Sequence, residues 1–379
     1  MKRIRIDENL YEAANERAED FINFGLTYYA KLRNFDFGPN DRTNISCLSS
    51  FISHRLIFEQ ELVNHALAKA PFSKIEKFIQ EIYWRTYWKG WLELRPEVWD
   101  DYARYKENPE IKKNIEEAKN GATGIDCFDA WVKELIEENY LHNHARMWFA
   151  SIWIFTLKLP WQSGANFFME HLLDGDAASN TLSWRWVAGL QTKGKHYLAQ
   201  ASNINKFTAK RFDPKNLILD ADPLSEKKSY EISTSIKDGN EKNKHKQLLV
   251  FENDLWIDGR EDLYSKYEDI FVFLIDNNQR NIQLSDKVMN FKNKAMEDFA
   301  KKIGNAKFVN QEILTSIEGL DVVYPGVGEN LDFIFKLKEK NPLSLNFLVR
   351  KEDSFCWQFS NKGFFNFKKN IPNIIQKFS

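Results

Sequence analysis

The chain has 379 residues, enough for two domains, and its 53 lysines and arginines nearly balance 54 aspartates and glutamates. A net charge of −1 gives no general indication of nucleic-acid binding, and three cysteines without metal-like spacing exclude a disulfide framework and a four-cysteine iron–sulfur cluster. The first residues show no apolar signal core and no stretch reaches membrane-spanning length, so we expect a cytoplasmic protein with reduced cysteines.

Apolar periodicity predicts a nearly all-helical first domain over residues 1–215. The charged stretch Leu94–Gly124 is expected to be peripheral. Helical spacing is found at Glu8–Phe24, Ile45–Leu67, Ile75–Leu94, Asp126–Asn139, Asn143–Leu157, Gly164–Leu173 and Asn180–Gly189.

A polar linker, residues 216–246, precedes a region with a different period, residues 247–379. Helical stretches at Asp286–Ile303 and Asn330–Lys338 fall between short apolar runs, and this alternation predicts a parallel α/β sheet. The Gly326–Gly328 stretch is only a weak phosphate motif. The predicted strands are Leu248–Phe251, Ile270–Ile275, Ala306–Val309, Asp321–Tyr324 and Leu345–Val349.

The segment Leu141–Trp186 concentrates polar groups in an apolar, tryptophan-rich region. Asp174 and Asp176 flank one glycine where an unpaired carboxylate would be costly, and Arg146 is the obvious counter-charge. Buried acid, buried base and clustered indoles predict a pocket for a large, polar, aromatic cofactor. The alternative is a tryptophan-rich helical core with one structural Arg–Asp pair.

The order of these residues resembles the FAD-binding domain of the DNA photolyase/cryptochrome family over roughly residues 15–215. The matching motifs are Ser46-x-Leu48-Ser49, Glu81-x-x-Trp84-Arg85, Thr123-Gly124, Phe128-Asp129-Ala130, Asn143-x-x-Arg146-Met147, Asp174-Gly175-Asp176-x-Ala178-x-Asn180, Trp184-x-Trp186 and Asp213-Pro214. The resemblance implies an all-helical photolyase-type FAD-binding domain followed by a smaller parallel-sheet α/β domain.

Family members usually place an α/β antenna domain before the flavin domain, and we expect none at that place in this chain. The stretches LLVFENDL and IFVFLID faintly resemble the start of such a domain. We therefore expect the second domain to be a rearranged antenna-like domain, or an unrelated α/β module that stabilises the fold or a dimer. No antenna pigment, metal or oligomeric state is assigned.

The resemblance implies FAD, reduced in the active form, as the cofactor. Cys47 and Ser50 depart from the arginine and proline that the family has there. The implied contacts are Ser46, Leu48 and Ser49 at the pyrophosphate, Tyr29 at the phosphates, Arg85 beside the cofactor, the Arg146–Asp174 pair at the flavin ring, Asp176 at the flavin or ribose, and Asn180 at flavin N5. An asparagine at the last position favours the fully reduced anionic flavin.

UV-damaged DNA is the implied partner, with a pocket for a cyclobutane pyrimidine dimer made by Glu81, Trp84, Asn143, Met147 and Trp186. Photolyases that act on (6-4) products instead have two histidines at the positions of Asn143 and Met147. The basic segment 185–211 is interpreted as a phosphate contact or as a solvated loop.

The resemblance also implies an electron relay in which Trp184 is the proximal and Trp161 the middle tryptophan. The terminal position falls near Asn108, which cannot donate an electron, so Tyr105 or Trp99 is considered as a substitute. Glu81, Asn180, Trp184 and Trp161 are therefore the predicted catalytic residues.

The function implied by these residues is light-dependent DNA repair, in which photoexcited reduced FAD splits cyclobutane pyrimidine dimers by electron transfer. The enzyme class is deoxyribodipyrimidine photolyase, a carbon–carbon lyase. The alternatives are a cryptochrome-like blue-light photosensor and a flavoprotein without repair activity.

Overall fold

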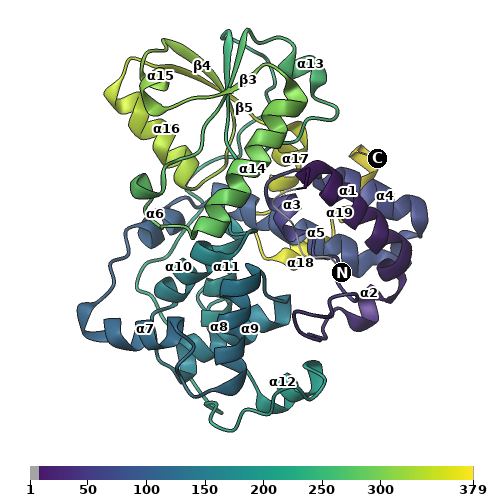
Figure 1. Ribbon diagram of the computed structural model, residues 1–379, viewed down its shortest axis with the longest axis vertical. Helices are drawn as coiled ribbons and strands as arrows, with labels where there is room; N and C mark the ends of the chain where they lie inside the picture. The colour runs from purple at the N-terminus through teal and green to yellow at the C-terminus, as the bar shows by residue number, and fades with distance from the viewer. Residues whose placement is uncertain (1–7, 379) are drawn as a thin grey trace.

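The computed structural model describes residues 8–378 and has two layers (Figure 1). A helical body spans residues 10–207, and an α/β domain that begins at residue 247 lies above it in this view. The C-terminal helices return from the α/β domain to the body. The two-part fold class predicted from the sequence is confirmed.

The helices of the body follow the predicted order. Asn9 starts the first of them by accepting hydrogen bonds from the backbone N–H groups of Tyr11 and Glu12, as an N-cap does. The elements are α1 (Leu10–Asp20), η1 (Phe21–Gly25), α2 (Leu26–Leu32), α3 (Ser49–Ser53), α4 (Glu59–Lys69), α5 (Phe72–Glu93), α6 (Glu97–Ala103), η2 (Pro109–Ile111), α7 (Lys112–Lys119), α8 (Asp126–Glu138), α9 (Asn143–Ser151), η3 (Ile152–Thr156), α10 (Trp161–His171), α11 (Ala177–Ala188) and α12 (Ala201–Phe207).

The single helix predicted over Ile45–Leu67 is wrong. The structure has α3 and α4 instead, separated by a turn in which Arg55 adopts a left-handed backbone with φ 51°. Its buried guanidinium donates to Asp254 at 2.9 Å and to Asp353 at 2.6–2.8 Å. Because both acids lie in the C-terminal half of the chain, local periodicity could not reveal the turn.

The stretch Leu94–Gly124, expected to be peripheral, is so only in part. On α6, Trp99 and Tyr102 are buried, and the Trp99 Nε1–H donates to a carboxylate oxygen of Asp332 at 2.8 Å. This bond ties the body to the α/β domain.

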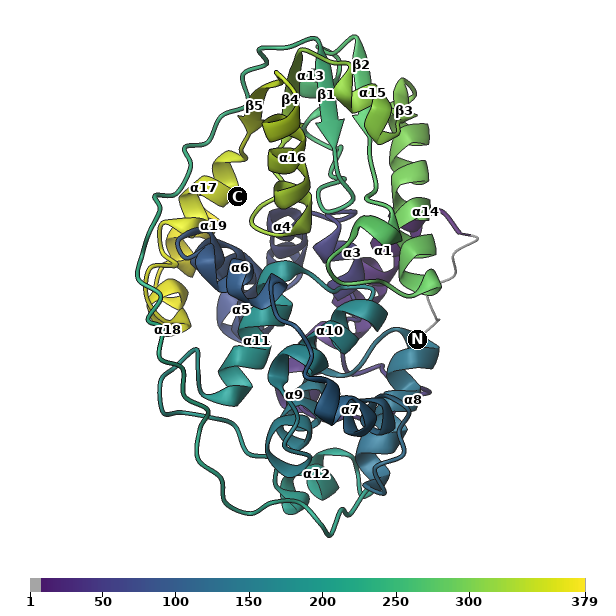
Figure 2. The same cartoon turned by 90° about the vertical axis from the view of Figure 1, so that its left-hand side faces the viewer.

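The connector between the two parts runs in extended conformation over the surface (Figure 2). It is held at several points: Arg185 pairs with Glu226, and Lys228 pairs with Asp101 at 2.6 Å. The Ser233 backbone N–H donates to the Leu94 carbonyl at 3.1 Å.

The sheet has five parallel strands in the order β3-β2-β1-β4-β5, and all five predicted strands form. The strands β1, β2 and β4 are apolar and mostly buried, as in parallel sheets covered by helices, whereas the edge strand β3 is largely exposed. The elements are β1 (Gln247–Val250), α13 (Glu261–Tyr264), β2 (Asp269–Val272), η4 (Asn277–Gln279), α14 (Asp286–Ile303), β3 (Ala306–Phe308), α15 (Gln311–Thr315), β4 (Gly319–Val323), α16 (Glu329–Lys340), β5 (Ser344–Leu348), α17 (Lys351–Trp357), α18 (Phe364–Lys368) and α19 (Ile371–Phe378).

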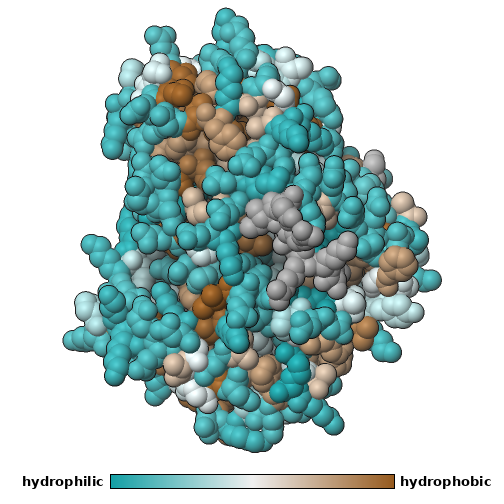
Figure 3. Space-filling model, viewed as in Figure 1, coloured by the Kyte–Doolittle hydropathy of each residue, from teal (hydrophilic) through white to brown (hydrophobic). Residues whose placement is uncertain are grey.

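The face shown in Figure 3 is mostly hydrophilic, with apolar side chains gathered chiefly over the α/β end. None of the helices within residues 8–378 is long and apolar enough to cross a membrane. No cluster of three or more metal-ligating side chains is found in the same part of the chain.

Candidate functional site

The turn before α11 gathers the charged groups predicted to hold the cofactor. Arg146 Nη1 donates to Asp174 Oδ2 at 2.9 Å, and its Nε donates to the Leu141 carbonyl at 2.9 Å. Arg85 on α5 pairs with Asp176 and lies 3.7 Å from Asp174. The structure therefore brings together the four charged residues that the sequence proposed, and we call residues 174–176 the cofactor turn.

Burial alone would raise the pKa of Asp174, but Arg146 and Arg85 outweigh it and hold that pKa below its usual value. Asp176 also caps α11 by accepting from the Ser179 backbone N–H at 2.8 Å. The cofactor turn thus lies at a helix start and carries an ionised Asp174 carboxylate.

The residues predicted at the phosphates lie at the start of α3. Cys47 adopts a left-handed backbone with φ 50°, and Ser49, the first residue of α3, also lowers the pKa of Asp174. Tyr29 lies elsewhere, beside Arg33 and Glu81. The phosphate role of Tyr29 stays a prediction.

Asn180 is almost fully buried on α11, and its Nδ2 donates to the Ala165 carbonyl at 2.9 Å. This bond fixes the amide orientation. Within residues 8–378, Asp174 Oδ1 and Ser179 Oγ are buried without a hydrogen-bond partner. Polar atoms of this kind are costly unless a ligand or water satisfies them.

The five residues predicted to hold a DNA lesion are all partly accessible, whereas their neighbours Tyr83 and Trp148 are buried. Three of the five have partners outside their own helix. Glu81 pairs with Arg33, and Trp84 stacks on Phe364. The Trp186 ring lies 5.9 Å from that of Tyr197 at 24°. Burial raises the pKa of the Glu81 carboxyl, and Arg33 opposes that rise.

Residues 78–219 match a family model described as the FAD binding domain of DNA photolyase. This part of the chain is similar to the FAD-binding domain of DNA photolyases. The resemblance noted in the sequence is confirmed there, and with it FAD as the cofactor.

The curated relatives include deoxyribodipyrimidine photo-lyases of Streptomyces griseus and Escherichia coli. The first is 36% identical over 149 residues, 39% of this chain and 32% of the relative. The second is 26% identical over 200 residues, which cover 49% of this chain and 40% of the relative. The chain thus spans less than half the length of these relatives.

Among solved structures, a bacterial class III photolyase from Agrobacterium tumefaciens is 28% identical with a TM-score of 0.45, covering 52% of this chain and 42% of its own. A Synechocystis cryptochrome is 20% identical with a TM-score of 0.47, and the match covers 52% of this chain and 43% of the cryptochrome chain.

The residues present fit FAD. A dinucleotide needs cationic and hydrogen-bonding groups within a largely apolar cavity, and the cofactor turn supplies Arg85, Arg146 and the unpartnered Asp174 Oδ1. The charged and unpartnered groups of the cofactor turn are therefore chemically suited to FAD.

A group of buried aromatic side chains lies beside the predicted middle tryptophan, Trp161. Trp184 is buried, and Trp161 stacks on Tyr102 at 5.4 Å. Tyr102 in turn meets Trp99 at 5.6 Å. Asn108, at the predicted terminal position, is exposed and not aromatic. Sequence reasoning missed Tyr102, although it lies on the same short helix as Trp99.

The basic side chains of segment 185–211 are buried in some places and exposed in others. Arg185 is buried and paired with Glu226, and Arg211 pairs with Asp36 at 2.8 Å. Lys193 and Lys195 are exposed. Arg185 and Arg211 are therefore already neutralised, and phosphate contact through the exposed lysines of this segment stays a prediction.

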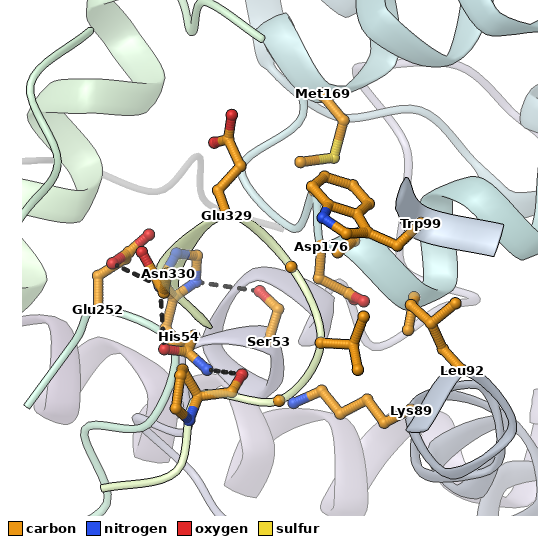
Figure 4. A pocket seen from close by; sticks show the side chains of 18 of the residues that line it. Ser53, His54, Lys89, Leu92, Trp99, Met169, Asp176, Glu252, Glu329 and Asn330 are labelled. Carbon is orange, nitrogen blue, oxygen red and sulfur yellow. Dashed lines mark hydrogen bonds between the residues drawn. The ribbon is translucent and has the colours of Figure 1, made fainter. Parts of the chain in front are cut away.

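A cavity of about 90 Å³ lies between the cofactor turn and the sheet (Figure 4). It sits where the strand order reverses, between the loops after β1 and β4, the usual crevice of an open parallel sheet. Lys89 reaches it from α5, and Glu252 and Glu329 from the α/β domain (Figure 4).

Ion pairs already organise this crevice. Glu252 accepts from Lys292 at 3.2 Å, and Glu329 accepts from Arg280 at 2.9 Å. Burial, reinforced by Lys292, lowers the pKa of His54 to about 3. The sequence could not indicate these residues, because they come from separate elements and belong to no local motif.

Proposed function

We propose that this protein is a deoxyribodipyrimidine photolyase, which repairs cyclobutane pyrimidine dimers in UV-damaged DNA under light. The observation that carries the proposal is that the cofactor turn occurs together with the five predicted lesion residues, which are partly exposed on α5, α9 and α11. That set contains two indoles, a carboxyl and an amide, which suit an unstacked pyrimidine pair.

When bound in reduced form, FAD supplies under blue light the electron that opens the cyclobutane ring and takes it back afterwards. The chain's residues hold and insulate that chemistry. Arg146 and Arg85 keep Asp174 ionised, so the turn presents a fixed charge pattern rather than one that changes with proton uptake. Asn180, fixed by the Ala165 carbonyl, carries no charge and gives up no proton easily.

The lesion side is arranged by different residues. Trp84 and Trp186 offer apolar ring faces for the two bases, and Glu81 offers a carboxyl to the pyrimidine edge. Arg33 pairs with Glu81 and fixes the orientation of that carboxyl. Asn143 and Met147 supply no acid, which favours cyclobutane dimers over (6-4) products.

The proposal is tested first by cofactor content and binding preference. Purified protein should carry non-covalent FAD that heat releases, and should bind a dimer-containing oligonucleotide more tightly than the undamaged one. Asp174→Ala should lose most of the FAD, whereas Asp213→Ala, at an exposed ion pair, should retain it. Colourless wild-type protein that FAD cannot reconstitute would refute the proposal.

A further inference from the structure

Trp84 lies at the border between two faces of α5. By helical periodicity it shares one face with Glu81 and Arg85, the predicted lesion and cofactor residues. On its other side it meets the C-terminal part of the chain. There the Phe364 ring stacks on it with centroids 3.6 Å apart and planes at 12°.

Among the described residues, Phe364 is the aromatic ring that stacks parallel to Trp84. Trp88 meets Trp84 tilted at 39°, and Tyr87 meets it edge-on at 82°. Phe364 is only 7% exposed, whereas Trp84 stays partly accessible. One face of the indole is therefore covered, so a base can stack on Trp84 only from the opposite face.

Phe364 is itself firmly held. Phe367, on the same short helix, is fully buried and packs against Tyr87 with centroids 5.7 Å apart. The Tyr87 hydroxyl donates to the Lys362 carbonyl at 3.0 Å, and Lys368 pairs with Glu76 at 3.1 Å. These contacts anchor α18 along α5, so Phe364 is a rigid support.

We propose that Phe364 is a positioning residue of the lesion pocket. It stacks on one face of Trp84, fixes the indole rotamer and leaves the opposite face for a base of the dimer. Parallel stacking of this kind restricts an aromatic side chain beyond its area burial. The inference rests on the proposed function and extends it, because it makes the C-terminal helices, distant in sequence, part of lesion recognition.

The position of Trp84 is tested without DNA. In protein labelled with 5-fluorotryptophan, the Trp84 resonance is identified as the one that Trp84→Phe removes. Phe364→Leu, which keeps an apolar side chain but removes the ring, should shift or broaden that resonance. Phe365→Ala, at the neighbouring residue that is 82% exposed, should leave it unchanged. An unmoved resonance in Phe364→Leu would overturn the proposal.

The consequence for recognition is tested by a double-mutant cycle on the FAD-loaded protein. The readout is the Kd ratio of undamaged to thymine-dimer oligonucleotide. Phe364→Leu should lower this ratio by about fivefold to tenfold, within the range of one lost base–aromatic stack. In a Trp84→Ala background the same change should have little further effect, because Phe364 acts through Trp84.

An equal loss in both backgrounds would show a merely structural role and overturn the proposal. In that case wild-type selectivity for dimers would still stand, and with it the proposed function. Wild-type protein that does not discriminate dimers would refute the proposed function instead, and the fluorine measurement would still decide whether Phe364 fixes Trp84.

Discussion

Gly328 of the α/β domain lies directly against Ala177, the residue that follows the cofactor turn. A Cβ added to Gly328 would come within 2.8 Å of the Ala177 Cβ. The neighbouring Val327 N–H donates to Glu93 Oε1 of α5 at 2.8 Å, which holds this loop in place. The second domain therefore packs closely against the residue next to the turn that carries Asp174 and Asp176.

Gly328→Ala should weaken FAD binding, because the new methyl group displaces Ala177 and with it the cofactor turn. We expect roughly a tenfold rise in the FAD Kd, the size of about 1.4 kcal/mol, measured by fluorescence titration of the apoprotein. Gly304→Ala is the matched control, since Gly304 also has a positive φ but an added Cβ meets no atom within 4 Å. Equal losses in both variants would show that backbone strain, not the contact, is responsible.

Asp174→Ala should lower the free energy of unfolding by about 3–5 kcal/mol, because Arg146 would keep a largely buried charge without its partner. The folded pKa of Asp174 is depressed, so its stabilisation is fully present above the unfolded pKa of about 3.9 and is lost as pH falls through the folded value. Urea unfolding from pH 7 down to pH 3 measures this.

The difference between wild type and Asp174→Ala should therefore shrink at the acid end. Asp213→Asn, at an exposed pair with Lys215, should change stability by less than about 1 kcal/mol at any pH. A difference for Asp174→Ala that grows on acidification would contradict the assigned direction.

Trp184→Phe should abolish or greatly slow photoreduction of the flavin under blue light with an external reductant. The substitution keeps a buried aromatic ring but removes the easily oxidised indole. Trp131→Phe is the control, because Trp131 is equally buried but packs on Trp148 outside the predicted relay. The absorbance of oxidised flavin follows the reaction, and dithionite should bypass the defect. Wild-type photoreduction by Trp184→Phe would rule out its role as proximal donor.

Trp186→Ala should weaken binding of dimer-containing DNA by about 1–3 kcal/mol, the usual scale of one base–aromatic stack, with flavin retained. Trp91→Ala is the control: this half-buried indole lies on α5 but contacts Arg95 rather than the predicted pocket. Fluorescence anisotropy with labelled oligonucleotides measures both. Similar losses for the two variants would remove Trp186 from the pocket.

Part of this site could be predicted from the sequence because its residues stand in local motifs. Arg146 and Asp174 form the expected ion pair, and the apolar runs gave all five strands within a few residues. The additional pairing of Arg85 with Asp176 was not foreseen. A spacing pattern predicts which residues share an element, but it does not fix the contacts between elements.

The remainder depends on contacts between distant parts of the chain. The break at Arg55 is stabilised by Asp254 and Asp353, and the support of Trp84 comes from Phe364. No periodicity within α5 or around Arg55 encodes these partners. They come together only because later parts of the chain pack on the helical body.

The central claim is tested most directly by light-dependent repair. Reduced, FAD-loaded protein is mixed with UV-irradiated oligothymidine and held in the dark or under blue light, and recovery of thymine absorbance is followed. We predict recovery under blue light only, on cyclobutane dimers and not on (6-4) products. No recovery by fully reduced protein on single- or double-stranded dimer DNA would contradict the account and favour a photosensor, and repair of (6-4) products alone would show that the lesion pocket is wrongly assigned.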